Sequence, residues 1–357
     1  MKTVICGGGV IGLLTARELA LAGREVIVLD KSAPGRESSW AGGGIVSPLY
    51  PWRYPPAVTA LASQAQRLYP DLAVALFRES GIDPELVQCG MLMLDAEDER
   101  DAMAWAAEQH KSVSLFTGAD LQGRFPSLSG FSRGIWLPEI ANIRNPRLLQ
   151  ALLVSLRGLG VRIIEGEEVT GWRRQNGRVT AARTRQGDLV AGDDFVIAAG
   201  AWSAELASGP VPRLPVRPVR GQMLLFRAEA DILASIILHQ GHYVIPRKDG
   251  HILCGSTLEE TGFDKSTTAD AAVKLREVAS RLVPQLAGQM PVAQWAGLRP
   301  GSPNGIPYIG VLPGEENLWV NAGHFRNGLV LAPASARLLA DRMLGRPPLV
   351  PAAPYQP

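Results

Sequence analysis

The sequence predicts an α/β fold, α+β overall, that combines a discontinuous Rossmann-like domain with a β-rich, antiparallel second domain. Three observations support this prediction. The chain opens with a strand, a glycine-rich turn, a helix and a second strand within residues 1–30. Strands that run into small residues recur near residues 200 and 320. From Val216 onward, between these two points, short alternating apolar runs are separated by turn residues, which is typical of antiparallel strands.

The first thirty residues predict a complete βαβ unit. Thr3–Cys6 is an apolar run, and apolar periodicity predicts a helix from Val10 to Ala22 with Gly23 as its C-terminal cap. A second apolar run, Glu25–Leu29, ends in Asp30. This order of elements, with glycines between the first strand and the helix, is the dinucleotide-binding fingerprint.

Each glycine of the first turn has its own physical reason. Gly7 allows a sharp turn, Gly9 lets a pyrophosphate approach bare backbone, and Gly12 lets the helix pack close to the strand. The helix N-terminus offers free N–H groups and a partial positive charge to phosphates. Asp30 follows the glycines at about the 20-residue spacing at which an acid accepts hydrogen bonds from ribose hydroxyls.

Composition excludes several classes of function. The chain has 357 residues, long enough for one large or two moderate domains, and its net charge of +2 is too small to indicate nucleic-acid binding. The sequence shows no secretory leader and no apolar run of about 20 residues, so we expect no membrane association. Its three scattered cysteines favour neither a disulfide framework nor a zinc site, and we expect a cytoplasmic protein without a metal.

The central segments extend the pattern. Ser38–Ile45 is a second small-residue stretch that permits close backbone approach to a flat or anionic group. Pro56–Ser80 is predicted as a helix and Leu86–Asp95 as a strand, with polar helical segments following to about Arg124. Asn145 is predicted as the N-cap of a helix that has Pro146 at its first position.

The second half of the chain returns twice to the Rossmann-like pattern. Asp194–Gly200 is an acid-led apolar strand that ends in Ala-Ala-Gly, and Glu316–Gly323 is a strand followed by a helix to about Leu344. The Gly- and Pro-rich region Gln294–Pro307 is predicted as a loop. We therefore expect a nucleotide-binding domain of residues 1–82, 143–213 and 297–357, interrupted by a substrate domain of residues 83–142 and 214–296.

Six segments together resemble the D-amino-acid oxidase family of FAD-dependent oxidoreductases, and within it the bacterial glycine oxidases. They follow the family's order along nearly the whole chain: residues 7–12, 38–45, 196–202, 242–247, 295–300 and 323–328. The resemblance implies FAD rather than NAD. It also implies non-covalent binding, because no cysteine occurs at 304–308, where covalent relatives hold their flavin.

The resemblance also assigns roles to individual residues. Arg299 matches the family's carboxylate-binding arginine, and Tyr243 would add a hydroxyl to the same carboxylate. Arg326 would touch flavin or substrate, and Leu258 would form part of the pocket wall. The residues predicted to contact the cofactor are Gly7, Gly9, Val10, Ile11, Gly12, Asp30, Lys31, Ser38, Ser39, Ala41, Gly42, Gly43, Gly44, Val169, Ala199, Gly200, Trp202, Arg299, His324, Phe325, Arg326, Asn327, Gly328 and Leu329.

The implied reaction is the oxidation of glycine, sarcosine and small D-amino acids by dioxygen. It would transfer a hydride from the substrate α-carbon to flavin N5, giving the 2-oxo acid, ammonia and hydrogen peroxide, and its imine product would supply thiamine thiazole synthesis. Two alternatives stay open at this point: a D-amino-acid dehydrogenase that reduces a quinone, and an FAD-binding subunit without turnover. A homo-oligomer is compatible with the sequence.

Overall fold

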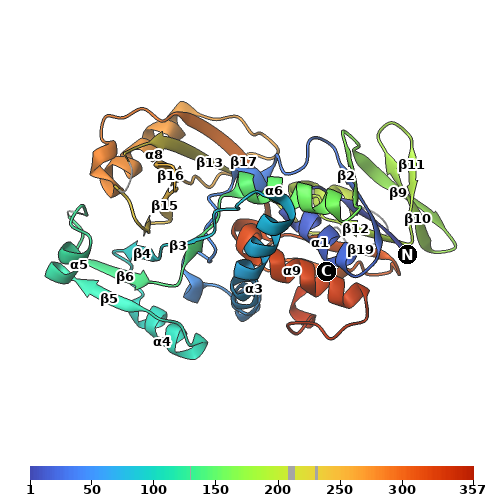
Figure 1. Ribbon diagram of the computed structural model, residues 1–357, viewed down its shortest axis with the longest axis horizontal. Coiled ribbons are helices and arrows are strands. Elements are labelled where there is room, and N and C mark those ends of the chain that lie inside the picture. The colour runs from blue at the N-terminus through green and yellow to red at the C-terminus, as the bar shows by residue number, and fades with distance from the viewer. Residues whose placement is uncertain (129, 208–213, 230–231) are drawn as a thin grey trace.

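Two large sheets dominate the computed structural model, which describes residues 1–128, 130–207, 214–229 and 232–357. Within these residues, one sheet has six strands and is mainly parallel, and the other has eight and is mainly antiparallel. The parallel sheet occupies the right half of Figure 1 and the antiparallel sheet the left half. The predicted fold class is therefore confirmed.

The parallel sheet has the strand order β18-β19-β12-β1-β2-β8. Its strands β1 and β12 are almost wholly buried, as expected for a sheet covered on both faces. Only the edge strand β18 runs antiparallel to its neighbour. The strands are β1 (Lys2–Cys6), β2 (Glu25–Asp30), β8 (Arg162–Glu165), β12 (Asp194–Ile197), β18 (Tyr308–Val311) and β19 (Leu318–Ala322).

Helices cover one face of this sheet and a small second sheet covers the other. The helix side forms one apolar core with residues of β1, β2 and β12. A separate apolar cluster joins the opposite face to the three-stranded sheet at the right of Figure 1. These elements are α1 (Val10–Leu21), α3 (Pro56–Ser80), α6 (Asn145–Gly158), α9 (Gly328–Met343), β9 (Val169–Gln175), β10 (Arg178–Thr184) and β11 (Leu189–Ala191).

The antiparallel sheet has the strand order β17-β13-β16-β15-β14-β4-β6-β5. One pairing, β14 with β4, is parallel. Helix α8 (Ala269–Leu282) contributes to the apolar core on one face. The strands are β4 (Met91–Leu94), β5 (Ser114–Thr117), β6 (Arg133–Leu137), β13 (Arg217–Arg227), β14 (Ile236–His239), β15 (His242–Pro246), β16 (His251–Gly255) and β17 (Ala293–Gly301).

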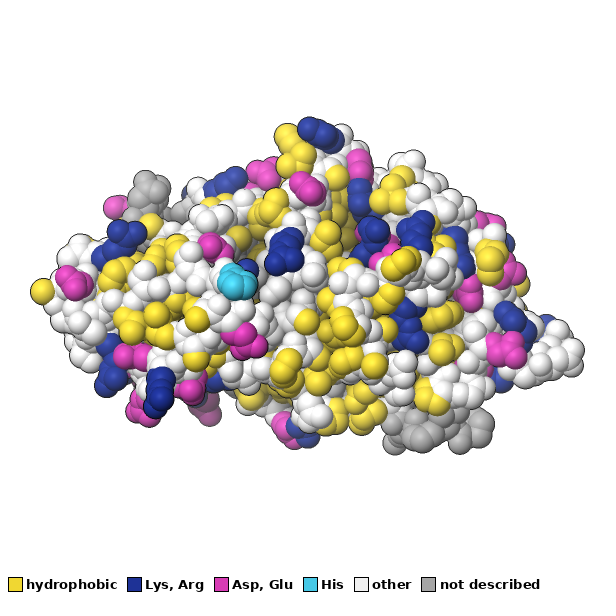
Figure 2. All heavy atoms as spheres, turned by 90° about the horizontal axis from the view of Figure 1, so that it is seen from below, with side chains coloured by type: hydrophobic (Ala, Val, Ile, Leu, Met, Phe, Trp, Pro, Cys, Tyr) yellow, Lys and Arg dark blue, Asp and Glu magenta, His cyan; other side chains and the backbone are white. Residues whose placement is uncertain are grey.

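Shorter elements complete the fold. They are α2 (Ser38–Ala41), β3 (Val87–Gln88), α4 (Glu99–Gln109), α5 (Gly118–Arg124), β7 (Ala141–Asn142) and α7 (Ser203–Leu206), with short 3-10 turns at Pro51–Arg53, Gly200–Trp202, Pro284–Leu286, Phe325–Asn327 and Ala353–Tyr355. On the face shown in Figure 2, basic and acidic side chains are interspersed. Among the described residues, no helix is both long and apolar enough to cross a membrane.

The prediction of a loop over Gln294–Pro307 is wrong for the first half of that range. Residues 293–301 form β17, which pairs with β13 along its length. A proline is tolerated because β17 is an edge strand, where the missing N–H of Pro300 costs no ladder bond on the outer side. Gly297 belongs in the strand because a β-carbon there would lie 2.5 Å from Ala41. Close approach, and not a turn, explains this glycine.

Two other local expectations are also wrong. Arg144, and not Asn145, precedes helix α6, and the Asn145 amide instead donates to the Ser39 carbonyl at 2.7 Å. The strand expected over Leu86–Asp95 is divided into β3 and β4. The break falls at Gly90, whose φ is +70° and where a β-carbon would lie 1.9 Å from the Trp136 ring.

The division into domains stays a prediction. Strand β17 runs across the expected boundary between residues 296 and 297, and the boundary at residue 213 lies outside the described residues.

Candidate functional site

One long cavity runs between the two sheets. At one end it is lined by Glu167, Glu168 and Val169, beside the carboxyl end of β2. At the other end it reaches Met223 of β13 and Tyr243 of β15. The glycine turn after β1, the Ser38–Gly44 segment and the turn after β19 all line its length. The cavity thus lies at the carboxyl ends of parallel strands, where open α/β sheets bind ligands.

The glycine turn after β1 has the close backbone contacts that the sequence predicts. Gly7 has φ +114°, and a β-carbon there would lie 2.3 Å from the Ala198 carbonyl oxygen. A β-carbon at Gly12 would lie 1.9 Å from the Gly7 carbonyl oxygen. Gly9 precedes α1 and provides no side-chain cap, while the Val10 N–H donates to Ser39 Oγ at 2.9 Å. Apart from the paired Val10 N–H, the N-terminus of α1 therefore presents backbone without a capping side chain to the cavity.

Asp30 and Lys31 line the cavity beyond this turn. The Asp30 carboxylate accepts from the backbone N–H groups of Gly8 at 2.7 Å and Ser32 at 2.9 Å. Burial raises the pKa of Asp30, and these hydrogen bonds oppose that shift. The Lys31 ammonium lies 3.1 Å from the centre of the Trp202 ring, a cation–π contact.

The Ser38–Gly44 segment is held in place by three side chains. Asn145 donates to the Ser39 carbonyl, Trp295 Nε1 donates to the Ala41 carbonyl at 3.0 Å, and Arg247 Nη2 donates to the Gly43 carbonyl at 2.7 Å. Burial lowers the pKa of Arg247 to about 10. Because partners from α6, β17 and the β15–β16 turn converge here, this glycine-rich segment is fixed in place.

The turn after β19 presents backbone to the cavity and leads into α9. His324 is buried and its Nε2 lies 3.0 Å from Ser335 Oγ. Burial lowers the pKa of His324 to about 3, which keeps the ring neutral. Phe325 has φ +49°, and α9 begins at Gly328 without a side-chain cap from Asn327. Arg326 is exposed and lines the cavity.

Arg299 is the cationic residue at the end of the cavity lined by Met223 and Tyr243. Its Nη1 donates to the carbonyls of Arg220 and Thr257, each at 3.2 Å, and its Nη2 donates to Ser256 Oγ at 2.7 Å. Burial lowers the pKa of Arg299, while the neighbouring Tyr243 opposes the shift. Within the described part of the chain, no carboxylate forms an ion pair with Arg299. Arg299 is half-buried and lines the cavity, and a guanidinium of this kind is arranged to receive an anion from it.

Most of the predicted site residues lie together around this cavity. Those that line it are Gly7, Gly9, Val10, Ile11, Asp30, Lys31, Ser38, Ser39, Ala41, Gly42, Gly43, Gly44, Val169, Ala199, Gly200, Trp202, Tyr243, Arg299, His324, Phe325, Arg326, Gly328 and Leu329. Gly12 and Asn327 are buried behind the wall, and Leu258 is 56% exposed on the loop after β16, outside the cavity lining.

Several residues that line the cavity were not predicted from the sequence. They include Glu167, Asn145, Asn321, Gly221, Met223 and Ser256. A signal was available for Gly221, since an isolated glycine within a strand indicates close approach by another group. Asn145 has a signal too, but it was interpreted as a helix cap.

The residues present fit a dinucleotide. Three lining side chains have buried oxygens without a hydrogen-bond partner: Asn145 Oδ1, Glu167 Oε2 and Asn321 Oδ1. Together with the glycine turns, these acceptors leave room and hydrogen-bonding capacity for a ligand with N–H and O–H donors. In the described chain, no cluster of three or more His, Cys, Asp or Glu side chains could hold a metal. Fold and site define a dinucleotide-dependent protein with a small anion-binding pocket.

Comparison with known proteins shows to which family of dinucleotide-dependent proteins the chain belongs. Residues 2–342 match the family model described as FAD dependent oxidoreductase, and the chain belongs to this family. Its cofactor is accordingly FAD. The predicted family resemblance is thereby confirmed.

Individual relatives are consistent with this family assignment. A protein of Pseudomonas aeruginosa named glycine oxidase is 52% identical, covering 100% of this chain and 98% of the relative. The bifunctional protein ThiO/ThiG of Trichormus variabilis is 32% identical over 95% of this chain and 52% of its own length. The crystal structure of glycine oxidase from Geobacillus kaustophilus is 29% identical with a TM-score of 0.94, and covers 99% of this chain and 97% of that one.

Proposed function

We propose that this protein oxidises glycine and other small amines, namely sarcosine and small D-amino acids, with dioxygen as the electron acceptor. Water and dioxygen are consumed, and the 2-oxo acid, hydrogen peroxide and an amine are released; the amine is ammonia for glycine and other primary amino acids and methylamine for sarcosine. The single observation that carries the proposal is Arg299, a half-buried guanidinium that lines the cavity with only neutral hydrogen-bond partners. The names of the relatives at 52% and 51% identity support it.

Arg299 would bind the substrate carboxylate. A guanidinium offers two parallel N–H donors that match a carboxylate, and burial strengthens the charge-assisted bonds. Tyr243, which lines the same end and is 8% exposed, would add its hydroxyl. Arg326 would lie toward the mouth, where its exposed side chain can contact substrate or flavin. Carboxylate binding at one fixed point orients the α-carbon for reaction.

The cofactor would lie along the cavity. The α1 N-terminus and the glycine turn would hold the pyrophosphate, and Asp30 the ribose hydroxyls. Residues 42–44 and 324–329 would border the flavin ring, with the positive end of α9 directed toward it. Bound FAD would supply the redox chemistry, a two-electron oxidation of the substrate at its α-carbon with dioxygen as the final acceptor.

We further propose that the flavin is held without a covalent bond. Among the cysteines, only Cys6 lines the cavity. Burial raises the pKa of its thiol well above the usual range, so Cys6 has little thiolate with which to react. The free thiols are also those of a reducing compartment, which supports a cytoplasmic location.

The imine formed from glycine would be a precursor for the thiazole of thiamine. The printed name of the ThiO/ThiG relatives supports this placement.

The decisive experiment uses the purified, flavin-containing protein. Glycine, sarcosine, D-alanine and D-proline are added one at a time without oxygen, and the flavin absorbance near 450 nm is followed, as is usual for flavins. We expect bleaching with glycine, and one hydrogen peroxide per turnover in air. Bleaching without peroxide would favour the quinone-reducing dehydrogenase, and failure of all four amines to bleach the flavin would favour the subunit without turnover.

A further inference from the structure

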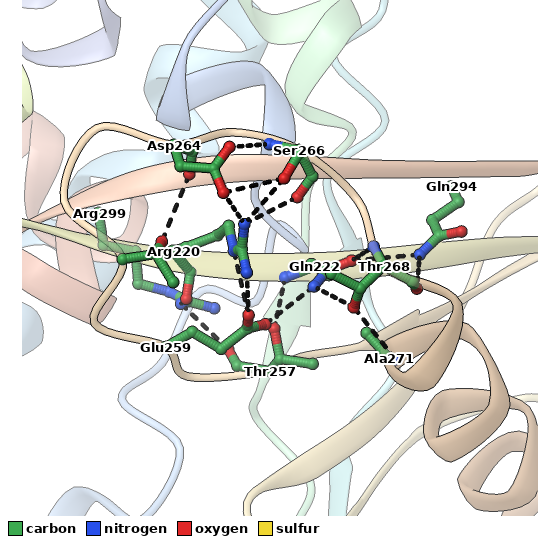
Figure 3. Close-up of polar contacts among 11 residues, drawn as sticks. Arg220, Gln222, Thr257, Glu259, Asp264, Ser266, Thr268, Ala271, Gln294 and Arg299 are labelled. Atoms are coloured by element: carbon green, nitrogen blue, oxygen red, sulfur yellow. Dashed lines mark hydrogen bonds and ion pairs between the residues drawn. The ribbon is translucent and has the colours of Figure 1, made fainter.

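Three acceptors hold the Arg299 guanidinium, and they come from only two segments. The Arg220 carbonyl belongs to β13, while Ser256 Oγ and the Thr257 carbonyl belong to the segment that follows β16. We name residues 256–268 the β16–α8 loop. Figure 3 shows Arg299 at one side of this arrangement, with the loop folded over β13. The position of Arg299 therefore depends on how this loop is held on the strand.

Strand β13 has two faces with different contacts. Gly221 and Met223 line the cavity, whereas Arg220 and Gln222 contact the β16–α8 loop. This division follows from the alternation of side chains along a strand. One strand thus separates the substrate end of the cavity from the polar network that secures the loop.

On the cavity face, Gly221 provides the space that Arg299 occupies. Arg299 is paired in register with Val219, so Gly221 is its diagonal neighbour, within reach of a long side chain. A β-carbon at Gly221 would lie 2.2 Å from both Nη1 and Nη2 of Arg299. The guanidinium occupies the space that a side chain at position 221 would need, so any side chain there would displace it.

On the loop face, Arg220 is the central residue. Its guanidinium is 5% exposed and bonds Glu259 through Nε at 3.0 Å and Asp264 through Nη1 at 2.6 Å. Gln222 adds a bond from its Nε2 to Glu259 Oε1 at 2.9 Å, and its backbone N–H donates to Thr257 Oγ1 at 2.9 Å. Figure 3 shows Arg220 between the two carboxylates.

The two guanidiniums differ in charge compensation. Arg220 is neutralised by two carboxylates of the loop, while Arg299, joined to it through the Arg220 carbonyl, has neutral acceptors only. Arg220 is therefore not available to compete for a substrate carboxylate, and its ion pairs act on the loop.

We propose that Gly221 and Arg220 are positioning residues for the substrate carboxylate: Gly221 by leaving room for the Arg299 guanidinium, and Arg220 by securing the loop that supplies two of its acceptors. The proposal rests on the proposed function, in which Arg299 binds the substrate. It concerns substrate capture and not the cofactor, so flavin binding should be unaffected.

The first test is Gly221→Ala. Its matched control is Gly310→Ala on β18, where an added β-carbon would likewise lie 2.2 Å from a guanidinium nitrogen, that of Arg342, but outside the cavity lining. We expect Gly221→Ala to raise the glycine concentration for half-maximal anaerobic bleaching, and the Kd of acetate followed by flavin absorbance, by at least about tenfold. The limiting bleaching rate and the flavin content should change by less than about threefold. Gly310→Ala should leave all four near wild type.

The second test is Arg220→Gln, which stays informative if Gly221→Ala fails to fold. Its control is Arg217→Gln, which removes an exposed ion pair between the same strand and the same loop, to Glu260. We expect Arg220→Gln to weaken acetate and glycine binding by about tenfold and Arg217→Gln to have little effect. Equal effects of the two variants, or a lowered limiting rate with unchanged half-saturation, would overturn the proposal.

Arg299→Ala separates the two levels of inference. If Arg299→Ala loses acetate and glycine binding while Gly221→Ala and Arg220→Gln retain it, the positioning proposal fails and the proposed function stands. If Arg299→Ala binds glycine as wild type does, or wild type is not bleached by glycine, the proposed function fails, and the positioning proposal with it.

Discussion

Gly12 packs on Gly7 so closely that a β-carbon at position 12 would lie 1.9 Å from the Gly7 carbonyl oxygen. Gly7 cannot move aside, because its own β-carbon position lies 2.3 Å from the Ala198 carbonyl oxygen. Three backbone segments, from β1, α1 and the end of β12, therefore meet without intervening side chains. The shape of the turn beside the cavity is set by this contact, although Gly12 itself does not line the cavity.

Gly12→Ala should therefore destabilise the protein and lower its flavin content. The new methyl group meets backbone, which cannot rotate away, so we expect a loss of at least about 2 kcal/mol in the free energy of unfolding. The matched control is Gly158→Ala in α6, where no atom lies within 4 Å of the added β-carbon and alanine should gain up to about 1 kcal/mol. Thermal unfolding and the flavin-to-protein absorbance ratio measure both effects. Full flavin content with unchanged unfolding would contradict this account.

Arg299→Ala should impair substrate capture while the flavin stays bound. Removing the guanidinium leaves a substrate carboxylate without its partner, and we expect kcat/KM for glycine to fall by the equivalent of about 2–5 kcal/mol. Arg299→Lys should restore charge but not the paired donors, giving an intermediate loss. Arg178→Ala, which removes an exposed ion pair to Glu316, serves as control and should be silent. Wild-type kcat/KM in Arg299→Ala would remove the basis of the proposed function.

His324 predicts a pH dependence of stability with a definite sign. Its pKa is lowered from 6.5 to about 3 by burial, so between these values the unfolded chain binds a proton that the folded protein does not. Stability is fully present above the unfolded pKa and declines as pH falls toward the folded pKa, by about 1.4 kcal/mol per pH unit. His324→Gln should remove this loss, so the difference in unfolding free energy between wild type and variant should shift by about 2 kcal/mol from pH 6.5 to pH 5. If the unfolding free energies of wild type and His324→Gln changed in parallel with pH, the assigned effect of His324 would be refuted.

Arg247→Met should destabilise the protein and loosen the segment next to the flavin. The Arg247 guanidinium donates to Asn142 Oδ1, to the Ile143 carbonyl and to the Gly43 carbonyl. Removing it leaves buried acceptors unpaired, at a cost of about 1–3 kcal/mol for each unsatisfied group. Lys248→Met, on the same turn, removes only an exposed pair to Asp83 and should cost less than about 1 kcal/mol. Denaturant unfolding of the two variants, compared at equal flavin content, gives the result; equal stabilities would argue against the assigned role.

Local patterns in the sequence were sufficient to predict the cofactor end of the site. The glycine turn, Asp30 and the β19–α9 turn combine a strand, small residues and a helix within a few positions, and their backbone contacts are close to those predicted. The strand β17 was missed because its glycine and proline usually indicate a loop. Only its pairing with β13 and its contact with Ala41 explain them.

The substrate end depends on contacts between distant segments. Arg299 could be singled out from the family motif, but Arg220, Gly221 and Ser256 have no local pattern that connects them with it. Their relationship arises from the register of β13 and β17 and from the return of the β16–α8 loop, none of which follows from propensity or periodicity. Leu258 shows the reverse case: its position in the sequence matches a pocket residue, yet its side chain points to solvent.

The bridge made by Arg247 has a consequence for turnover. This side chain ties the eight-stranded sheet to the Gly43 carbonyl, so parting the two halves of the molecule would break its charge-assisted hydrogen bond to that carbonyl. Amino acid and product should consequently exchange through the mouth near Arg326 in a protein that stays closed throughout each catalytic cycle. Side-chain rotations at the mouth, more than a hinge motion of the two sheets, would then limit the rate of release.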